Sequence, residues 1–195
     1  MEYRSLGKTG IQVSAVAFGA WTIGGPGEWG WGPVDDRESI SAIHRALDLG
    51  VTLIDTADAY GTGHSEEVVR RALGPRRKDV IIATKFGYVF DEQGNEAGVD
   101  GSRDHVMRAC EASLRRLGTD YIDLYQMHTP DDKVPLEETM GALVELRRQG
   151  KIRAIGVSNF AVAQLAEASR HAELVSDQPP FSLLNREIEK DILPC

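Results

Sequence analysis

The sequence has little cysteine and no long apolar run. Its 195 residues include only Cys110 and Cys195, so a disulfide framework is excluded and a reducing compartment is expected. No apolar run approaches the ~18 residues of a membrane-spanning helix, and residues 1–6 lack the charged-then-apolar order of a signal peptide. We therefore expect a cytoplasmic protein without membrane contact.

The sequence also lacks an excess of basic residues. Asp and Glu number 30 against 22 Lys and Arg, which gives a formal net charge of −8 at pH 7. Because nucleic-acid binding needs a concentrated positive field, a nucleic-acid partner is disfavoured. The five histidines are not spaced with cysteines or carboxylates as metal ligands are, so no metal site is predicted. With 42% hydrophobic and 27% charged residues, the composition is typical of a folded globular protein.

Short apolar runs alternate with amphipathic stretches, and this alternation organises the whole chain. The runs predict parallel strands that are buried on both faces, and a turn at residues 7–10 predicts a hairpin before the first of them. The amphipathic stretches predict helices, for which Asp35, Ser102 and Gly118 supply start and stop signals. The predicted strands lie at residues 13–18, 51–54, 80–84, 121–127, 152–157 and 174–175, and the last predicted helix begins at residue 187 and continues to residue 195.

Six strand–helix units with no linker between them indicate one α/β domain over residues 1–195. Two architectures fit, an open doubly wound sheet and an incomplete (β/α)₈ barrel, and periodicity leaves both open. In either one, functional groups gather just beyond the carboxyl ends of the strands. In this sequence those positions hold Asp55, Lys85, His128, Ser158, Asn159 and Gln178, with Tyr60 five residues beyond Asp55.

Tyr60, Lys85, Asp55 and His128 together have the chemistry of a proton-donor site. A tyrosine pKa near ~10 is too high for efficient acid catalysis at neutral pH, and a nearby Lys85 ammonium would lower it. Asp55 could hold Lys85 in place, and His128 could orient a substrate carbonyl by a hydrogen bond. Each residue alone has an ordinary structural explanation, so it is their joint position at one rim that indicates a site.

No side chain donates a hydride, so the electrons for such a site must come from a cofactor. Ser158, Asn159 and Gln178 carry hydroxyl and amide groups that suit the carboxamide of a nicotinamide. Trp21, on the loop after the first predicted strand, could form a wall of the substrate pocket.

Residues 25–30 match the glycine pattern of a dinucleotide-binding loop. That motif also requires a helix to begin at once, so that backbone amides reach the pyrophosphate. Here Trp29 lies inside the motif and the next predicted helix begins only near Asp36. We interpret this stretch as a loop of the pocket instead.

The segments that carry these residues resemble the aldo-keto reductases. The resemblance covers nearly the whole chain, and six ordered segments make a chance similarity very improbable. The matching segments are residues 18–21, 55–66, 83–85, 120–128, 156–160 and 178–185.

The resemblance implies a (β/α)₈ barrel, or TIM barrel, that uses NADPH, with NADH as an alternative, to reduce aldehydes and ketones to alcohols. It implies a catalytic tetrad of Asp55, Tyr60, Lys85 and His128, with Tyr60 as the general acid. The positions that match the family's cofactor contacts are Ala20, Trp21, Asp55, Ser158, Asn159 and Gln178.

Members of the family carry two further strand–helix units, so the resemblance implies six units of eight, a C-terminally truncated barrel. The open edges of such a barrel would favour self-association. Two other functions stay open: a catalytically inactive binding or regulatory protein (or a non-functional fragment) on the same scaffold, and another barrel enzyme that uses Lys85 and His128. The expected partner is a small carbonyl substrate, whose identity the sequence does not define.

Overall fold

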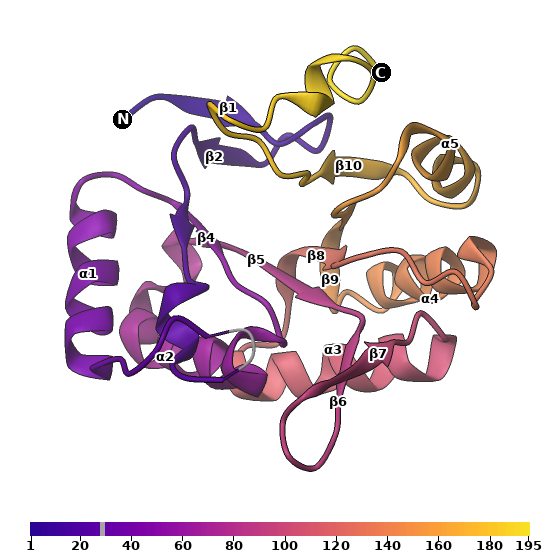
Figure 1. The fold of residues 1–195 in the computed structure, drawn as a ribbon. Coiled ribbons are helices and arrows are strands. Elements are labelled where there is room, and N and C mark those ends of the chain that lie inside the picture. Colours follow the sequence, from indigo (N-terminus) through magenta and orange to yellow (C-terminus); the bar gives the residue numbers. More distant parts are fainter. Residues whose placement is uncertain (28–29) are drawn as a thin grey trace.

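A six-stranded parallel sheet forms the centre of the molecule, which is described by a computed structural model over residues 1–27 and 30–195 (Figure 1). All five strand pairs of this sheet are parallel. The strand order is β10-β9-β8-β5-β4-β3, which follows the order of the chain throughout. The strands are β3 (Phe18–Gly19), β4 (Leu53–Asp55), β5 (Ile81–Phe86), β8 (Ile122–Met127), β9 (Ile152–Val157) and β10 (Leu174–Asp177).

Helices follow the strands and return the chain to the start of the next one. Because the strand order in the described sheet never reverses, the sheet has no topological switch point, and the doubly wound alternative is excluded. The arrangement is that of a (β/α) barrel, as one of the two predicted architectures requires. The helices are α1 (Asp36–Asp48), α2 (His64–Leu73), α3 (Arg103–Leu117), α4 (Leu136–Arg148) and α5 (Val162–His171). Short 3₁₀ turns lie between strands and helices: η1 (Thr22–Gly24), η2 (Tyr60–Gly63) and η3 (Gly74–Asp79).

The helix boundaries follow the signals in the sequence. The Asp35 side chain accepts a hydrogen bond of 2.7 Å from the Arg37 amide at the start of α1. Ser102 caps α3 in the same way, since its hydroxyl accepts from the amide of His105. Gly118 ends α3 with a φ of 62°, a left-handed conformation that favours glycine. All three predicted signals are confirmed.

The hairpin predicted before the first strand is present, but the apolar run at residues 13–18 is shared between two strands. β1 (Tyr3–Ser5) pairs antiparallel with β2 (Gln12–Ser14). The run at residues 13–18 therefore supplies the end of this hairpin and, after a short break, the start of β3. The prediction of one continuous strand over this run is wrong.

Two other parts of the chain differ from the prediction. A second hairpin, β6 (Tyr88–Phe90) with β7 (Glu96–Val99), lies between β5 and α3 and was not predicted. The helix predicted from residue 187 is reduced to the 3₁₀ turn η4 (Glu187–Glu189), followed by turns. Its apolar positions have little to pack against, as the 67% exposure of Leu193 indicates, and a short helix without packing is unstable. Glu28 and Trp29 of the predicted pocket loop lie outside the described residues.

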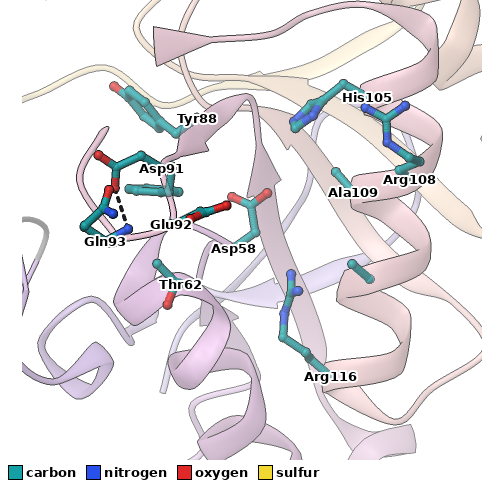
Figure 2. Close-up of a pocket in the computed structure, with 13 residues that line it drawn as sticks. Asp58, Thr62, Tyr88, Asp91, Glu92, Gln93, His105, Arg108, Ala109 and Arg116 are labelled. Atoms are coloured by element: carbon teal, nitrogen blue, oxygen red, sulfur yellow. Dashed lines mark hydrogen bonds between the residues drawn. The ribbon is translucent and has the colours of Figure 1, made fainter. Parts of the chain in front are cut away.

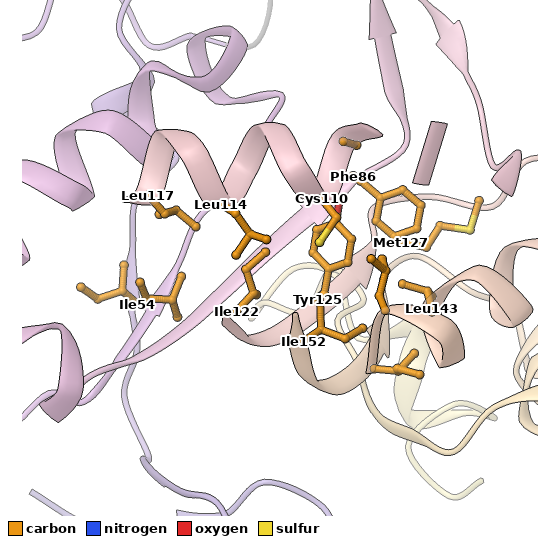
Figure 3. Close-up of a cluster of buried hydrophobic side chains, with 14 of the residues drawn as sticks. Ile54, Phe86, Cys110, Leu114, Leu117, Ile122, Tyr125, Met127, Leu143 and Ile152 are labelled. Carbon is orange, nitrogen blue, oxygen red and sulfur yellow. The ribbon is translucent and has the colours of Figure 1, made fainter. Parts of the chain in front are cut away.

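The hydrophobic core lies between the sheet and the helices that cover it (Figure 3). Phe86 of β5 stacks on Tyr125 of β8, with ring centroids 4.8 Å apart. Cys110 of α3 is part of the same core, and burial raises the pKa of its thiol to about 12. This thiol therefore packs as a small apolar group and is not a nucleophile. None of the helices in the described part of the chain combines the length and apolar composition needed to cross a membrane.

The buried side chain of Leu143 on α4 offers a test of this core. We expect Leu143→Ala to lower the free energy of unfolding by about 2–5 kcal/mol, because truncation leaves a cavity. Leu184→Ala is the matched control, since this side chain is 99% exposed and its truncation should change stability by about 0.5 kcal/mol or less. Urea unfolding of both variants measures the difference, and equal losses would contradict the described packing.

Candidate active site

Polar side chains from neighbouring strands meet at the carboxyl edge of the sheet. Asp55 is the last residue of β4, and Lys85 lies one residue before the end of β5. The residue that follows each later strand extends the backbone ladder: the amide of His128 donates to Phe86 and that of Ser158 donates to Met127, both at 2.8 Å. The parallel register thus brings the predicted strand-end residues to one rim.

The ammonium of Lys85 is the centre of this group. Lys85 is 1% exposed, and its Nζ donates to both carboxylate oxygens of Asp55, at 2.8 and 3.0 Å. It also donates to the carbonyl of Thr56 at 3.0 Å and to the hydroxyl of Tyr60 at 3.2 Å. An ammonium has three protons, so these three residues can satisfy all of them.

Tyr60 begins η2 and is held between aromatic rings. Its ring stacks on Trp21, with centroids 6.1 Å apart and an interplanar angle of 25°. On another side it meets the ring of His128 edge to face, at 5.7 Å. The ring is buried while its hydroxyl faces Lys85, so the phenol has one defined orientation.

The pKa of Tyr60 differs from the sequence-based prediction. Burial of the phenol raises its pKa above the ordinary value. The positive charge of Lys85 lowers the pKa, but this effect is smaller than that of burial. The predicted effect of Lys85 is therefore present, but the expected net decrease of the Tyr60 pKa is wrong. The reason is that a buried phenolate loses its hydration.

His128 is a neutral imidazole at physiological pH. Burial is the main cause that lowers its pKa to about 3, and the nearby charge of Lys85 adds to the effect. Its ring also contacts Tyr88 edge to face, with centroids 4.9 Å apart. A neutral imidazole can donate one hydrogen bond to a carbonyl oxygen without adding charge to the pocket.

A cavity of about 450 Å³ opens in front of these groups. Its size is within the range of small-molecule and cofactor sites. Asp55 pairs with Lys85 without lining the cavity, and Ala20 is fully buried, with its backbone amide bonded to the Asp55 carbonyl. The other predicted site residues all line the cavity: Trp21, Tyr60, Lys85, His128, Ser158, Asn159 and Gln178.

Hydrogen bonds hold the amide side chains at the rim of this cavity. Gln178 donates to Asp55 at 3.2 Å and accepts from Gln126 at 3.1 Å. Asn159 donates to the carbonyl of His128 at 2.9 Å, and its φ of 63° places it in the left-handed region. A non-glycine residue in that conformation is uncommon outside functional sites and turns.

Several residues of the cavity were missed by the sequence analysis. Tyr88 contributes a wall and comes from the unpredicted β6–β7 hairpin. Its position two residues after the end of β5, next to Gly87, was the available signal. Thr129, Pro179 and Pro180 complete the lining, each within two residues of a predicted site residue.

A second and larger cavity, of about 630 Å³, lies near η2, α3 and the β6–β7 hairpin (Figure 2). Its walls include Asp58, His105 and Arg108. Among the described residues it shares Tyr88 with the smaller cavity but contains no member of the predicted tetrad. The members of the predicted tetrad therefore identify the smaller cavity as the candidate active site.

The fold and this site define a (β/α) barrel with acid–base groups at the carboxyl ends of its strands. Residues 15–195 match the sequence profile of the Aldo/keto reductase family. The chain belongs to this family, and the resemblance found in the sequence is confirmed.

Curated relatives agree with this assignment. The chain is 47% identical over 196 residues to the aldo-keto reductase YhdN of Bacillus subtilis, covering all of this chain and 58% of that protein. It is 37% identical over 201 residues to a protein named NADH-specific methylglyoxal reductase in Escherichia coli, covering 97% of this chain and 61% of the relative. The chain thus spans a little over half the length of these relatives.

Solved structures share the fold. A glycerol dehydrogenase of Gluconobacter oxydans superposes with a TM-score of 0.86 at 45% identity, covering 94% of this chain and 56% of that one. An aldo-keto reductase of Bacillus halodurans gives the same TM-score at 36% identity, covering 97% of this chain and 61% of its own. The predicted barrel class is confirmed.

The lowered pKa of His128 predicts a loss of stability in acid. Below the ordinary histidine pKa of ~6.5 the unfolded chain takes up a proton at His128, whereas the folded protein, with a pKa of about 3, does not. This difference should cost about 2 kcal/mol of folding free energy as the pH falls from about 7 to about 5. The His128→Gln variant has no such group, so its loss of folding free energy over the same pH interval should be smaller by about 2 kcal/mol. Denaturant unfolding at both pH values measures it, and an unchanged pH dependence in the variant would contradict the burial of a neutral ring.

Proposed function

We propose that this protein reduces a small aldehyde or ketone to an alcohol with a nicotinamide cofactor, and that Tyr60 supplies the proton. The observation that carries the proposal is the Tyr60 hydroxyl, 3.2 Å from the Lys85 ammonium in a cavity that it shares with neutral His128. Membership of the Aldo/keto reductase family supports it.

The cavity suits the nicotinamide end of such a cofactor. Ser158, Asn159 and Gln178 place hydroxyl and amide groups on one wall, and these can hydrogen-bond a carboxamide. Trp21 offers an aromatic surface beside Tyr60. When bound, the cofactor supplies a hydride to the carbonyl carbon.

The side chains of this protein then have separate tasks. Tyr60 donates its hydroxyl proton to the carbonyl oxygen as negative charge develops there. The Lys85 ammonium stabilises the phenolate that remains, and Asp55 holds the ammonium in position through two oxygens. His128 orients the carbonyl with its N–H. The raised pKa of Tyr60 keeps the phenol protonated at neutral pH, ready to donate.

The names of the relatives are consistent with this chemistry but differ in detail. One is named as an NADH-specific methylglyoxal reductase and another as a glycerol dehydrogenase. We retain NADPH as the proposed cofactor, with NADH as the alternative, and a small carbonyl compound as the substrate class. The edge strands β3 and β10 remain our proposed route for self-association.

Replacing the proposed acid tests this function. We expect Tyr60→Phe to lower the rate of carbonyl reduction roughly a hundred- to ten-thousand-fold, because only the proton donor is removed. Oxidation of NADPH or NADH with an aromatic aldehyde measures the rate, and fluorescence titration of the cofactor should give a nearly unchanged dissociation constant. Tyr3→Phe is the matched control, because this half-exposed phenol donates to the carbonyl of Gly50, outside the cavity lining. A Tyr60→Phe variant as fast as the Tyr3→Phe control would refute the proposed role.

A further inference from the structure

The first turn of α2 is bonded to the ends of two strands through Ser65. The Ser65 hydroxyl donates to the carbonyl of Ala20, just beyond β3, at 2.8 Å. It also accepts a bond of 2.8 Å from the hydroxyl of Thr56, which directly follows Asp55 at the end of β4. Ser65, Thr56 and Ala20 are all fully buried. These bonds fix two strand ends against the same helical turn.

Glu66, the next residue, reaches a third strand. One of its carboxylate oxygens accepts a bond of 2.6 Å from the hydroxyl of Thr84 on β5. Thr84 directly precedes Lys85, and neighbouring side chains on a strand point to opposite faces. Thr84 therefore faces α2 while Lys85 faces the cavity. The bond to Glu66 thus fixes β5 to α2 at the residue next to Lys85.

The Glu66 carboxylate is costly to bury, and the structure provides it with a counter-charge. Its second oxygen accepts from Nε of Arg116 on α3, at 2.6 Å. The Arg116 side chain also borders the larger cavity, opposite Asp58 (Figure 2). A buried ion pair adds little net stability, because desolvation offsets the attraction. What this pair does provide is a fixed position for the carboxylate oxygen that accepts from Thr84.

The same helical turn closes the loop that carries Tyr60. The bond between Thr56 and Ser65 joins the two ends of residues 56–65, and Tyr60 lies within this loop. The Thr56 carbonyl is itself one of the acceptors of the Lys85 ammonium. Ser65 therefore anchors the loop of Tyr60, while Glu66 anchors the strand of Lys85.

We propose that Ser65 and Glu66 are positioning residues that together set the separation between Lys85 Nζ and the Tyr60 hydroxyl. Ser65 acts on the loop through Thr56, and Glu66 acts on β5 through Thr84. The catalytic importance of this positioning rests on the proposed function, whereas the positioning itself does not depend on it. Releasing either anchor should separate the two groups while their own side chains stay intact.

The titration of the Tyr60 phenol measures this separation directly. We would label tyrosine Cζ with ¹³C, assign the Tyr60 signal with Tyr60→Phe, and follow it from about pH 8 to well above the ordinary phenol pKa of ~10, because burial raises the pKa of Tyr60. Thr84→Val keeps the shape of the side chain and the net charge but removes the donor to Glu66. Because the Lys85 charge lowers the Tyr60 pKa, we expect the midpoint in this variant to rise by about half a unit or more.

Matched variants separate positioning from simple loss of stability. Thr84→Ser keeps the hydroxyl and should restore the wild-type midpoint. Thr139→Val is the control, because Thr139 on α4 is equally buried and its hydroxyl donates to the carbonyl of Gly101 at 2.7 Å, away from the tetrad. It should lose stability but leave the midpoint unchanged. Ser65→Ala releases the other anchor without altering charge, and it provides the test if Thr84→Val does not fold.

The outcomes are distinct for geometry and function. A raised midpoint in Thr84→Val or Ser65→Ala, with Thr84→Ser and Thr139→Val unshifted, supports the proposal. Unshifted midpoints in both test variants overturn it. If the protein reduces carbonyls, kcat should also fall about tenfold or more in the test variants, since small misplacements are costly to catalysis. If the wild type reduces none, the proposed function fails while the titration still decides the positioning role.

Discussion

The buried ammonium of Lys85 is the group on which the geometry of the site depends. A buried cation is tolerated only when each of its protons has a partner. Here the partners are Asp55, the Thr56 carbonyl and the Tyr60 hydroxyl. The ammonium comes from β5, and its partners come from β4, the residue that follows β4, and η2. Satisfying one ammonium therefore fixes these three elements relative to one another. The parallel register and the first turn of α2 are the means by which the fold meets that requirement.

Burial then determines the charge of the remaining groups. It raises the pKa of Tyr60 and lowers that of His128, so both are neutral at physiological pH although one is an acid and the other a base. Among the described residues that line the cavity, the one permanent charge is that of Lys85, and the carboxylate of Asp55, 2.8 Å from the ammonium, is its counter-charge. Such a pocket offers hydrogen-bond donors to a neutral carbonyl group. The Lys85 ammonium then stabilises the negative charge that forms on Tyr60 after its proton has moved. This combination is the physical basis of the proposed reduction.

Much of this site could be predicted from the sequence because strand ends are marked by abrupt changes in polarity. His128 directly follows the apolar run at residues 121–127, and Ser158 follows the run at 152–157, so the sequence alone places both at the rim. Tyr88 is marked in the sequence only by its position two residues after β5, because β6 and β7 are short, half-buried strands without a clear period. The net shift of the Tyr60 pKa was beyond this reasoning, since the shift depends on packing against Trp21 and His128, which are distant in sequence.

The titration of Tyr60 in Lys85→Met tests the central role of the ammonium most directly. Lys85 lowers the Tyr60 pKa both by its charge and by its hydrogen bond, whereas the Asp55 charge raises it. Removing the ammonium abolishes both lowering effects and leaves the effect of Asp55 in place. The ¹³C midpoint of Tyr60 is therefore expected to rise by about one unit or more relative to the wild type. A midpoint that stays the same or falls would contradict the account, because Tyr60 would then not be controlled by the charge of Lys85.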